Sequence, residues 1–344
     1  MTDAPTGDGR DSSSPPQDAN ASGGGLSTLG TVHASAGGVY RVVLEDGTEV
    51  EATLRGRLKK KGGEGRGGGR KGGSGTAVGD QVVIGDRVRV SGSRTEGYTI
   101  EEVLPRVTAF VRRGPGGRRA RVVVANLDRV LVVVAAREPD MRLEQVDRLL
   151  AVAEAGGMHP ILVVNKVDLP GAAEVTGGLQ ELYGGVGYRV LGVSAAAGTG
   201  MDAFAELVCE GSSALVGPSG AGKSTLLNTV DPRLHLPTGA LSRKTRRGRH
   251  TTVSARLLEL SCGGRVADTP GFGDVGVWGV EPGEVAACFP EFEAYRGRCR
   301  FRGCSHTVEP GCAVREAVAE GAIPESRYES YLRLYEESVE AARR

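Results

Sequence analysis

The chain has 344 residues, 39% of them hydrophobic, which is enough for two or three domains and at least one sizeable core. Its 43 Lys and Arg residues nearly balance 42 Asp and Glu residues, so attraction to a nucleic acid must come from local basic patches. No apolar run reaches about 18 residues, and residues 1–25 lack the basic and apolar regions of a signal peptide. We therefore expect a cytoplasmic protein without a membrane anchor.

The N-terminal part of the chain predicts a disordered leader and a small β-barrel. Residues 1–28 are rich in Gly, Ser, Pro and Asp and offer few large apolar side chains to bury. Residues 29–105 contain short strand-like runs separated by Asp-Gly and Gly-Asp turns. These runs lie at 38–44, 48–54, 81–84 and 87–90. The pattern is typical of an oligonucleotide-binding (OB) fold, which is an all-β barrel.

A Gly-rich insertion at residues 55–75 interrupts this barrel pattern. It contains eight Lys or Arg residues and only one acidic residue, Glu64. We expect a mobile basic loop there.

Residues 106–280 predict an α/β domain. Six arginines and no acidic residue lie between Arg106 and Arg121, after which the chain becomes strongly apolar. Continuous apolar strands at 130–136 and 161–164 enclose an apolar-periodic helix at 143–155, which is a βαβ unit. Further strands are expected at 189–193, 214–216, 256–260 and 266–267.

A phosphate-binding loop follows the strand at 214–216. The segment GPSGAGKST matches GxxxxGK[ST] and precedes a plausible helix, which makes a chance Gly-rich turn the weaker reading. Its backbone amides can bind phosphate oxygens, Lys223 can reach the β and γ phosphates, and Ser224 can bind Mg²⁺. The predicted phosphate-binding residues are Gly217, Pro218, Ser219, Gly220, Ala221, Gly222, Lys223, Ser224 and Thr225.

A guanine-reading motif ends the strand at 161–164. Asn165, Lys166, Val167 and Asp168 form an NKxD string, in which the Asp168 carboxylate can accept both N–H donors of the guanine edge. The aliphatic part of Lys166 can lie against the ring. A solvated turn would be the better reading of this string alone. Together with the phosphate-binding loop it predicts GTP.

Two further segments complete the expected nucleotide site. Asp268, in the string DTPG, can hold a water ligand of Mg²⁺, and the Gly271 amide can meet the γ phosphate. Ser194 and Ala195 follow a strand and can brace the base, although a plain turn explains them equally well.

The residue that orients the attacking water is a separate hypothesis. Phe272 follows Gly271 and cannot form the required hydrogen bond. We expect His250 to position the water and Thr251 to complete the Mg²⁺ ligands. The alternative for His250 is a solvated loop histidine.

Residues 281–344 predict a zinc-binding, mostly helical domain. Cys299, Cys304, His306 and Cys312 supply three thiolates and one imidazole, a complete ligand set for one structural Zn²⁺. The other cysteines, Cys209, Cys262 and Cys288, lie apart and are expected to fill core positions. An amphipathic helix is expected at the end of the chain, with Tyr328, Leu332, Tyr335 and Val339 on its apolar face.

The motifs occur in an inverted order, because the base-reading motif precedes the phosphate-binding loop. In this order the chain resembles the circularly permuted GTPases. The preceding barrel, the GRHTT segment at 248–252 and the following Cys/His cluster resemble, more narrowly, the ribosome small-subunit-dependent GTPase A family. The resemblance covers nearly all of residues 29–340, although the basic insertion departs from the simplest family pattern.

This resemblance implies that an OB-fold domain, a permuted GTPase and a zinc domain act together in late maturation of the small ribosomal subunit. It implies GTP hydrolysis stimulated by the subunit. Basic stretches at 55–75, 106–121 and 243–249 also favour contacts with ribosomal RNA. The expected partners are the small ribosomal subunit with its rRNA and GTP or GDP, with the protein acting as a monomer.

Two other functions remain as alternatives. Phe272 is consistent with a GTP-dependent RNA-binding scaffold with little hydrolysis. A P-loop nucleotide kinase would prefer adenine, which Asp168 disfavours.

Overall fold

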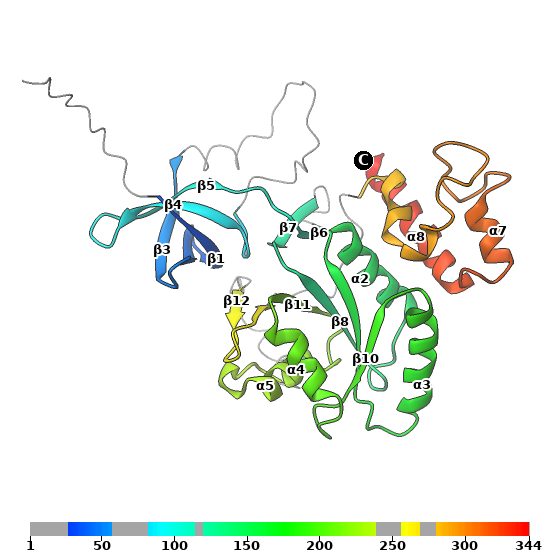
Figure 1. Ribbon diagram of the computed structural model, residues 1–344, viewed down its shortest axis with the longest axis horizontal. Coiled ribbons are helices and arrows are strands. Elements are labelled where there is room, and N and C mark those ends of the chain that lie inside the picture. Colours follow the sequence, from blue (N-terminus) through cyan, green and yellow to red (C-terminus); the bar gives the residue numbers. More distant parts are fainter. Residues whose placement is uncertain (1–26, 57–81, 114–119, 239–255, 269–279, 344) are drawn as a thin grey trace, which may run out of the picture.

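The structure is a computed structural model that describes residues 27–56, 82–113, 120–238, 256–268 and 280–343, with the backbone alone at 112, 113 and 120. A β-barrel, an α/β part and a helical part follow one another from left to right in Figure 1. Within the described part of the chain, no helix is both long and apolar enough to cross a membrane.

The N-terminal strands close into a barrel with the order β1-β2-β3-β5-β4, and a β1–β4 pairing completes the ring. Alternate side chains fill its core; in β2, for example, Tyr40 and Val42 are buried between more exposed neighbours. The predicted OB-type barrel is confirmed. Its strands are β1 (Thr28–Ala36), β2 (Val39–Leu44), β3 (Glu49–Leu54), β4 (Arg87–Ser93) and β5 (Gly97–Val103).

The expectation of a strand at 81–84 is wrong for residues 82–84, which the structure describes. Val82, Val83 and Ile84 are buried, but only Ile84 forms a β-bridge, to Val124. The segment instead turns at Asp86, whose carboxylate accepts a hydrogen bond from the Val83 amide at 2.8 Å. The segment is therefore apolar because it is buried between two sheets, and not because it forms a strand of either sheet. Residues 57–75 of the basic insertion lie outside the described residues.

The barrel is joined to the α/β part by a two-stranded sheet, β6 (Ala109–Arg113) with β7 (Ala120–Ala125). Arg106, just before it, forms a bidentate ion pair with the buried Asp86, at 2.7 and 2.9 Å. This pair fixes the end of the barrel against the connecting sheet.

The α/β part has the sheet order β10-β9-β8-β11-β13-β12, in which all neighbours are parallel except the antiparallel pair β12–β13. The strands are β8 (Arg129–Ala135), β9 (His159–Asn165), β10 (Arg189–Val193), β11 (Ser212–Val216), β12 (Arg256–Glu259) and β13 (Arg265–Asp268). The α/β sheet expected from the apolar runs is confirmed.

Helices cover both faces of this sheet, because the central strands are buried on both sides. Val130, Val132 and Val134 of β8 belong to one apolar cluster, and Leu131 and Val133 belong to the other. The first cluster includes α2 and α3, and the second includes α4 and α5. These helices are α2 (Leu143–Ala155), α3 (Ala172–Leu179) with the π-helical η1 (Gln180–Gly184), α4 (Met201–Cys209), α5 (Lys223–Val230) and the 3-10 turn η2 (Pro232–Leu234).

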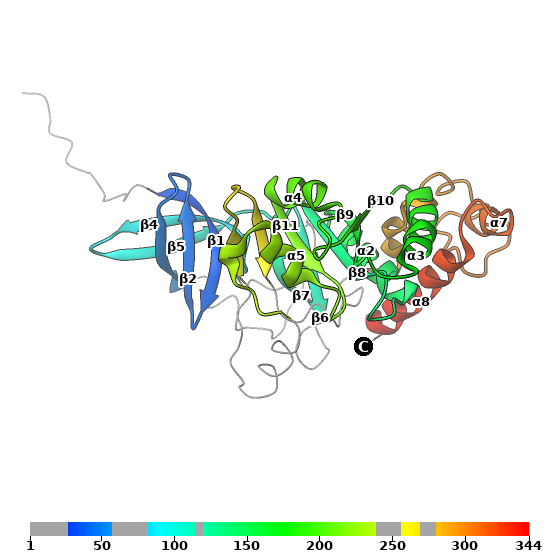
Figure 2. The same ribbon diagram turned by 90° about the horizontal axis from the view of Figure 1, so that it is seen from below.

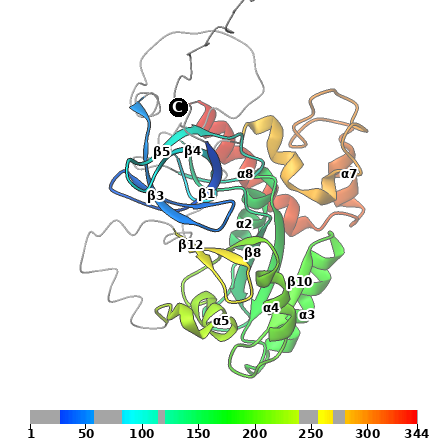
Figure 3. The same ribbon diagram turned by 60° about the vertical axis from the view of Figure 1, so that its left-hand side comes forward.

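The barrel and the central sheet are continuous through one strand. β1 pairs antiparallel with β12 at Ala34 and Arg256, so the strands form one eleven-stranded sheet. Figures 2 and 3 show β12, in yellow, lying between the barrel and the rest of the α/β part.

The C-terminal part is helical and shares the core of the α/β part. Phe289, Phe292, Tyr331 and Leu334 belong to the same buried cluster as α2. The elements are η3 (Pro282–Cys288), η4 (Pro290–Phe292), α7 (Ala313–Ala319) and α8 (Glu325–Ala342).

The C-terminal helix predicted from the apolar spacing is confirmed as α8, but its buried face was misplaced. The expected residues Tyr328, Leu332, Tyr335 and Val339 are only partly buried. The most buried residues lie one row away and include polar side chains: Arg327, Ser330, Tyr331, Leu334 and Ser338. Arg327 and Ser330 are buried because they meet the carboxylate of Asp147 on α2.

Candidate functional site

The phosphate-binding loop lies between β11 and α5, and two of its glycines are required by close contacts with neighbouring strands. A Cβ atom at Gly217 would lie 2.0 Å from the carbonyl oxygen of Val133, and one at Gly222 would lie 2.2 Å from Nδ2 of Asn165. Both residues also have positive φ angles. The segment therefore forms a tight loop directly against β8 and β9.

Lys223 begins α5 and folds back over this loop. Its Nζ donates to the carbonyl oxygens of Gly217 at 2.7 Å and Pro218 at 2.8 Å. Ser224 follows within the first turn of the helix and is partly exposed. A cationic ammonium group, glycine amides and a hydroxyl are thus gathered at one helix N-terminus, an arrangement that suits an anionic phosphate chain.

The NKVD motif is connected directly to the phosphate-binding loop. Asn165 ends β9, is 3% exposed, and donates from Nδ2 to the Ala221 carbonyl oxygen at 2.8 Å. Its Oδ1 is buried and has no hydrogen-bond partner among the described residues. This amide therefore links two motifs and also holds an acceptor that a bound group can use.

Ser194 links the Ser194–Ala195 segment to the NKVD motif. It ends the β10 region, and its Oγ donates to Oδ1 of Asp168 at 2.6 Å while accepting from the Ala197 amide at 3.0 Å. This geometry holds the exposed Asp168 carboxylate in one orientation. Ala195 follows Ser194 and is partly buried.

The loop after β8 also borders the site, although no sequence motif marked it. Lys166, which has a φ of 64°, donates from Nζ to the carbonyl oxygen of Glu138. A Cβ atom at Gly220 would lie 3.4 Å from Pro139. The only sequence signal for this loop is its place after a strand neighbouring β9 and β11, where open α/β sheets bind ligands.

Asp268 ends β13, next to the strand that leads into the phosphate-binding loop, since Ala267 pairs with Ala214. Its position agrees with the expected order of the motifs. The predicted residues His250, Thr251 and Gly271, together with Phe272, lie outside the described residues.

The predicted metal ligands Cys299, Cys304, His306 and Cys312 come together in the C-terminal part, with their ligand atoms within 4.8 Å of one another. The Cys299 and Cys312 Sγ atoms are 3.9 Å apart, and His306 Nδ1 lies 3.5 and 3.4 Å from them. Zn–S bonds of about 2.3 Å and Zn–N bonds of about 2.0 Å in a tetrahedron place ligand atoms about 3.5–3.8 Å apart. The four side chains therefore fit one tetrahedral ion.

The surroundings of the cluster hold its loop in place. Tyr328 donates to the His306 carbonyl oxygen at 2.8 Å, and Tyr331 donates to that of Ser305. Burial alone would raise the pKa of Glu309, but hydrogen bonds from Ser305 lower it to about 2, so its carboxylate is ionised and fixes the Ser305 turn.

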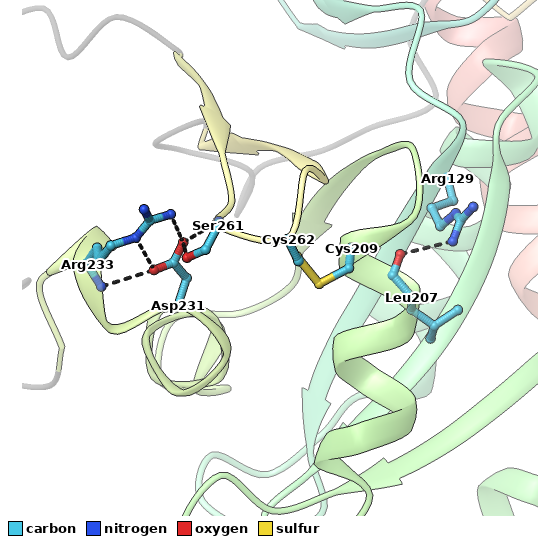
Figure 4. The surroundings of a disulfide bond; sticks show 7 residues. All are labelled: Arg129, Leu207, Cys209, Asp231, Arg233, Ser261 and Cys262. Carbon is cyan, nitrogen blue, oxygen red and sulfur yellow. Dashed lines mark hydrogen bonds and ion pairs between the residues drawn. A yellow bond between two sulfur atoms is a disulfide. The ribbon is translucent and has the colours of Figure 1, made fainter.

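The expectation that Cys209 and Cys262 fill core positions is wrong. They form a disulfide that connects the end of α4 to the turn between β12 and β13 (Figure 4), with Cα atoms 5.5 Å apart. Cys262 is exposed, because the turn lies at the surface. Cys288 is 3% exposed in the core, as expected.

Comparisons with known proteins agree with the fold and the family expected from the sequence. A family model described as RsgA GTPase matches residues 103–278. The chain is 46% identical over 314 residues to the Small ribosomal subunit biogenesis GTPase RsgA of Gemmatimonas aurantiaca, covering 90% of this chain and 97% of the relative. It is 34% identical to the protein of that name from Flavobacterium johnsoniae, covering 89% and 92%.

Two solved structures have a similar fold. The crystal structure of YjeQ from Thermotoga maritima is 31% identical, with a TM-score of 0.72, covering 91% of this chain and 99% of that one. That of YloQ, described as a circularly permuted GTPase, is 25% identical, with a TM-score of 0.67 and coverages of 92% and 96%. Although the motifs occur in an inverted order, the sheet brings them together at the carboxyl ends of its strands. Together with these similarities, this arrangement shows that the chain belongs to the RsgA GTPase family and is a circularly permuted GTP hydrolase.

Proposed function

We propose that this protein binds the small ribosomal subunit and hydrolyses GTP during late maturation of the subunit, acting as an assembly and release switch that the subunit stimulates. The names of its relatives support the subunit as partner. The observation that carries the GTP part is the pair of hydrogen bonds from Asn165 to the phosphate-binding loop and from Ser194 to Asp168. They join base-reading and phosphate-binding residues into one preformed site.

In this site, Asp168 accepts the two N–H donors of guanine, and Lys166 lies against the ring. The loop from Gly217 to Thr225 holds the phosphates, with Lys223 leaving its carbonyl partners for the β and γ oxygens. Gly271 contributes its amide to the γ phosphate. Ser194 keeps Asp168 oriented, because its hydroxyl already donates to that carboxylate.

The oxygen ligands near the loop fit Mg²⁺, which prefers hydroxyl, carboxylate and water oxygens. Ser224 and Thr251 would hold the ion, and Asp268 would hold one of its waters. When bound, the ion would neutralise part of the negative charge of the phosphates. His250 would position the attacking water.

The Cys299, Cys304, His306 and Cys312 cluster would hold one structural Zn²⁺, because its ligand spacings suit a tetrahedral site with no open position. We expect the ion to stabilise the loop that follows η4 rather than to take part in hydrolysis.

The partner would be contacted mainly through ribosomal RNA phosphates by the basic stretches of the chain. The protein would act in the cytoplasm as a monomer, with domains dividing near residues 105 and 280.

The proposal is tested by measuring phosphate release from GTP with and without isolated small subunits, together with cosedimentation in a GTP analogue and in GDP. Stimulated hydrolysis and weaker binding in GDP are expected. Nucleotide-dependent cosedimentation without phosphate release would favour the scaffold instead, and no interaction in either state would reject the proposal.

The His250→Ala variant tests the catalytic assignment. We expect it to bind GTP normally and to lose most of the subunit-stimulated rate, by about 100-fold or more, because positioned proton-transfer and water-orienting groups contribute about 100- to 10,000-fold. The Lys223→Ala variant is the control that loses nucleotide affinity. Full stimulated turnover in His250→Ala would remove this residue from catalysis.

A further inference from the structure

The loop that begins the metal cluster presents a cationic and aromatic surface. In the segment RGRCRFR, residues 296–302, the arginines alternate with other residues and Phe301 lies between the last two. We call this segment the arginine–phenylalanine loop. Arg296, Arg298, Arg300, Phe301 and Arg302 are all exposed, and Phe301 keeps 46% of its surface accessible.

The charges of this loop are largely uncompensated. Arg296 pairs with Glu293 at 2.8 Å. Among the described residues, none of Arg298, Arg300 and Arg302 has a carboxylate within ion-pair distance. The loop therefore offers three guanidinium groups to an external anion, and guanidinium forks suit phosphate oxygens.

The backbone of the loop is fixed rather than loose. The Arg298 amide donates to the Tyr295 carbonyl oxygen at 3.2 Å, and the Arg300 amide donates to that of Gly311 at 2.9 Å. The metal ligands Cys299 and Cys304 bracket Phe301. Because its backbone is already held, the loop would lose little conformational entropy when a ligand binds.

Phe301 distinguishes between possible partners. Its ring already has one cationic neighbour, the Arg300 guanidinium, 5.5 Å from the ring centroid. An acidic protein surface would use the arginines but would gain little from an exposed ring. An unpaired nucleotide uses both, because its base stacks on an aromatic side chain while adjacent phosphates meet arginines.

We propose that the arginine–phenylalanine loop binds a single-stranded segment of RNA, with one base stacked on Phe301 and the flanking phosphates contacted by Arg298, Arg300 and Arg302. The proposal rests on the proposed function only in taking this RNA to be part of the small ribosomal subunit. Stacking accepts any base, so the site selects unpaired RNA rather than a particular sequence.

The test uses the full chain, purified with zinc and loaded with a GTP analogue, and a fluorescent oligouridylate of about ten nucleotides. Phe301→Leu keeps an apolar side chain but removes the ring, and should weaken binding about fivefold to 100-fold without changing the salt dependence. Phe301→Trp should keep or improve the affinity. Arg302→Gln should lower the slope of log affinity against log salt by about 0.7.

Val308→Ala is the matched control, because Val308 is a second exposed apolar residue near the same cluster, 81% accessible. It should bind like the parent protein. Zinc content and thermal melting of each variant report whether the loop still folds. Basal GTP hydrolysis should be unchanged in every variant, since the loop shares no residue with the nucleotide site.

Two outcomes would overturn the proposal. If the arginine variant loses affinity while Phe301→Leu does not, the surface is an electrostatic patch suited to an acidic protein. If neither variant changes oligouridylate binding, the loop is not an RNA site.

The same variants in the subunit-stimulated assay separate this proposal from the proposed function. Absence of stimulation in the parent protein would reject the proposed function alone. If the subunit stimulates the parent protein and Phe301→Leu shows the same dependence of hydrolysis on subunit concentration, the loop does not contribute to binding the subunit.

Discussion

Asp168 and Ser194 follow different strands and their side-chain oxygens lie 2.6 Å apart, so the carboxylate that we propose reads guanine is oriented by a hydroxyl from another motif. Changing Asp168 to Asn should weaken GTP binding by about 100-fold, because hydrogen bonds to charged groups are worth about 1.5–3 kcal/mol each. The amide can donate to the O2 of xanthine, so preference should move toward xanthosine triphosphate. Competition binding with both nucleotides measures this change.

Ser194→Ala is the graded comparison for that experiment. It keeps the carboxylate but removes its hydrogen bond, so GTP affinity should fall by only about fivefold to tenfold. Unaltered guanine selectivity in Asp168→Asn would remove Asp168 from the base site.

Local strings allowed the nucleotide motifs to be located, since NKVD and GPSGAGKST each have a short and restrictive spacing. The sequence did not reveal the contribution of Glu138. Its carbonyl oxygen meets Lys166 only because β8 and β9 are neighbours in the sheet, and any residue type supplies a carbonyl. A backbone contact of this kind leaves no trace in side-chain identity.

Asp231 carries a second prediction at the residue scale. It follows α5 and accepts hydrogen bonds from Arg233 and from both the amide and the hydroxyl of Ser261. These bonds, first from Arg233 and then from Ser261, hold the pKa of Asp231 well below its usual range. The folded pKa is thus lower than the unfolded one, so this stabilisation is complete above about pH 5, begins to decline below about pH 4 and is fully lost only as pH falls through the lower, folded pKa.

Asp231→Asn should therefore lower the free energy of unfolding by about 1–2 kcal/mol at pH 7 and by clearly less at pH 3. Urea titrations at both pH values measure the difference. Asp140→Asn, which changes an exposed carboxylate, should have little effect at either pH. The prediction is contradicted if Asp231→Asn lowers the free energy of unfolding by the same amount at both pH values.

At the scale of elements, the β12–β13 hairpin is connected to several parts of the molecule. β12 pairs with the barrel strand β1, β13 ends at Asp268, and the turn between them is bonded to α4 through Cys209–Cys262 (Figure 4). The hairpin is thus placed to transmit movement between the nucleotide site and the barrel.

The disulfide should contribute measurably to stability, because it closes a loop with a sequence separation of 53 residues. A chain-entropy argument gives about 4 kcal/mol for a loop of this length, the upper end of the usual range of about 2–4 kcal/mol. Urea unfolding of the parent protein with and without a phosphine reductant should show this loss. Cys262→Ser should match the reduced parent and be insensitive to the reductant.

Cys288→Ser is the control, since it removes a buried thiol that is not in the disulfide and should leave the reductant effect intact. Equal stability of the oxidised and reduced parent would contradict the prediction.

The sequence indicated most strands, because apolar runs and alternation report burial directly. It did not reveal the disulfide or the β1–β12 pairing, since both depend on segments far apart in the chain. The misplaced face of α8 has a related cause. Arg327 reads as a solvent residue until Asp147 and Glu291 supply buried partners for it.

At the scale of the whole molecule, Arg327 joins the C-terminal part to the α/β part. It is fully buried, pairs with Asp147 of α2 at 2.8 Å and with Glu291 of η4 at 2.7 Å, and lies 4.7 Å from the Phe289 ring centroid. Because the two carboxylates come from the two parts, a single cation forms ion pairs with both sides of the junction. The cluster of Cys299, Cys304, His306 and Cys312 is thereby fixed in orientation relative to the nucleotide site.

Arg327→Met should destabilise this junction by about 3–5 kcal/mol, because it leaves two buried carboxylates without a counter-charge. Arg333→Met on the same helix removes only exposed pairs with Glu144 and Glu329, so it should cost far less stability. Urea unfolding measures both variants. If the junction transmits subunit binding to the nucleotide site, Arg327→Met should also keep basal GTP hydrolysis while losing stimulation by the subunit. Equal effects of the two substitutions would mean that Arg327 does not hold the two parts together.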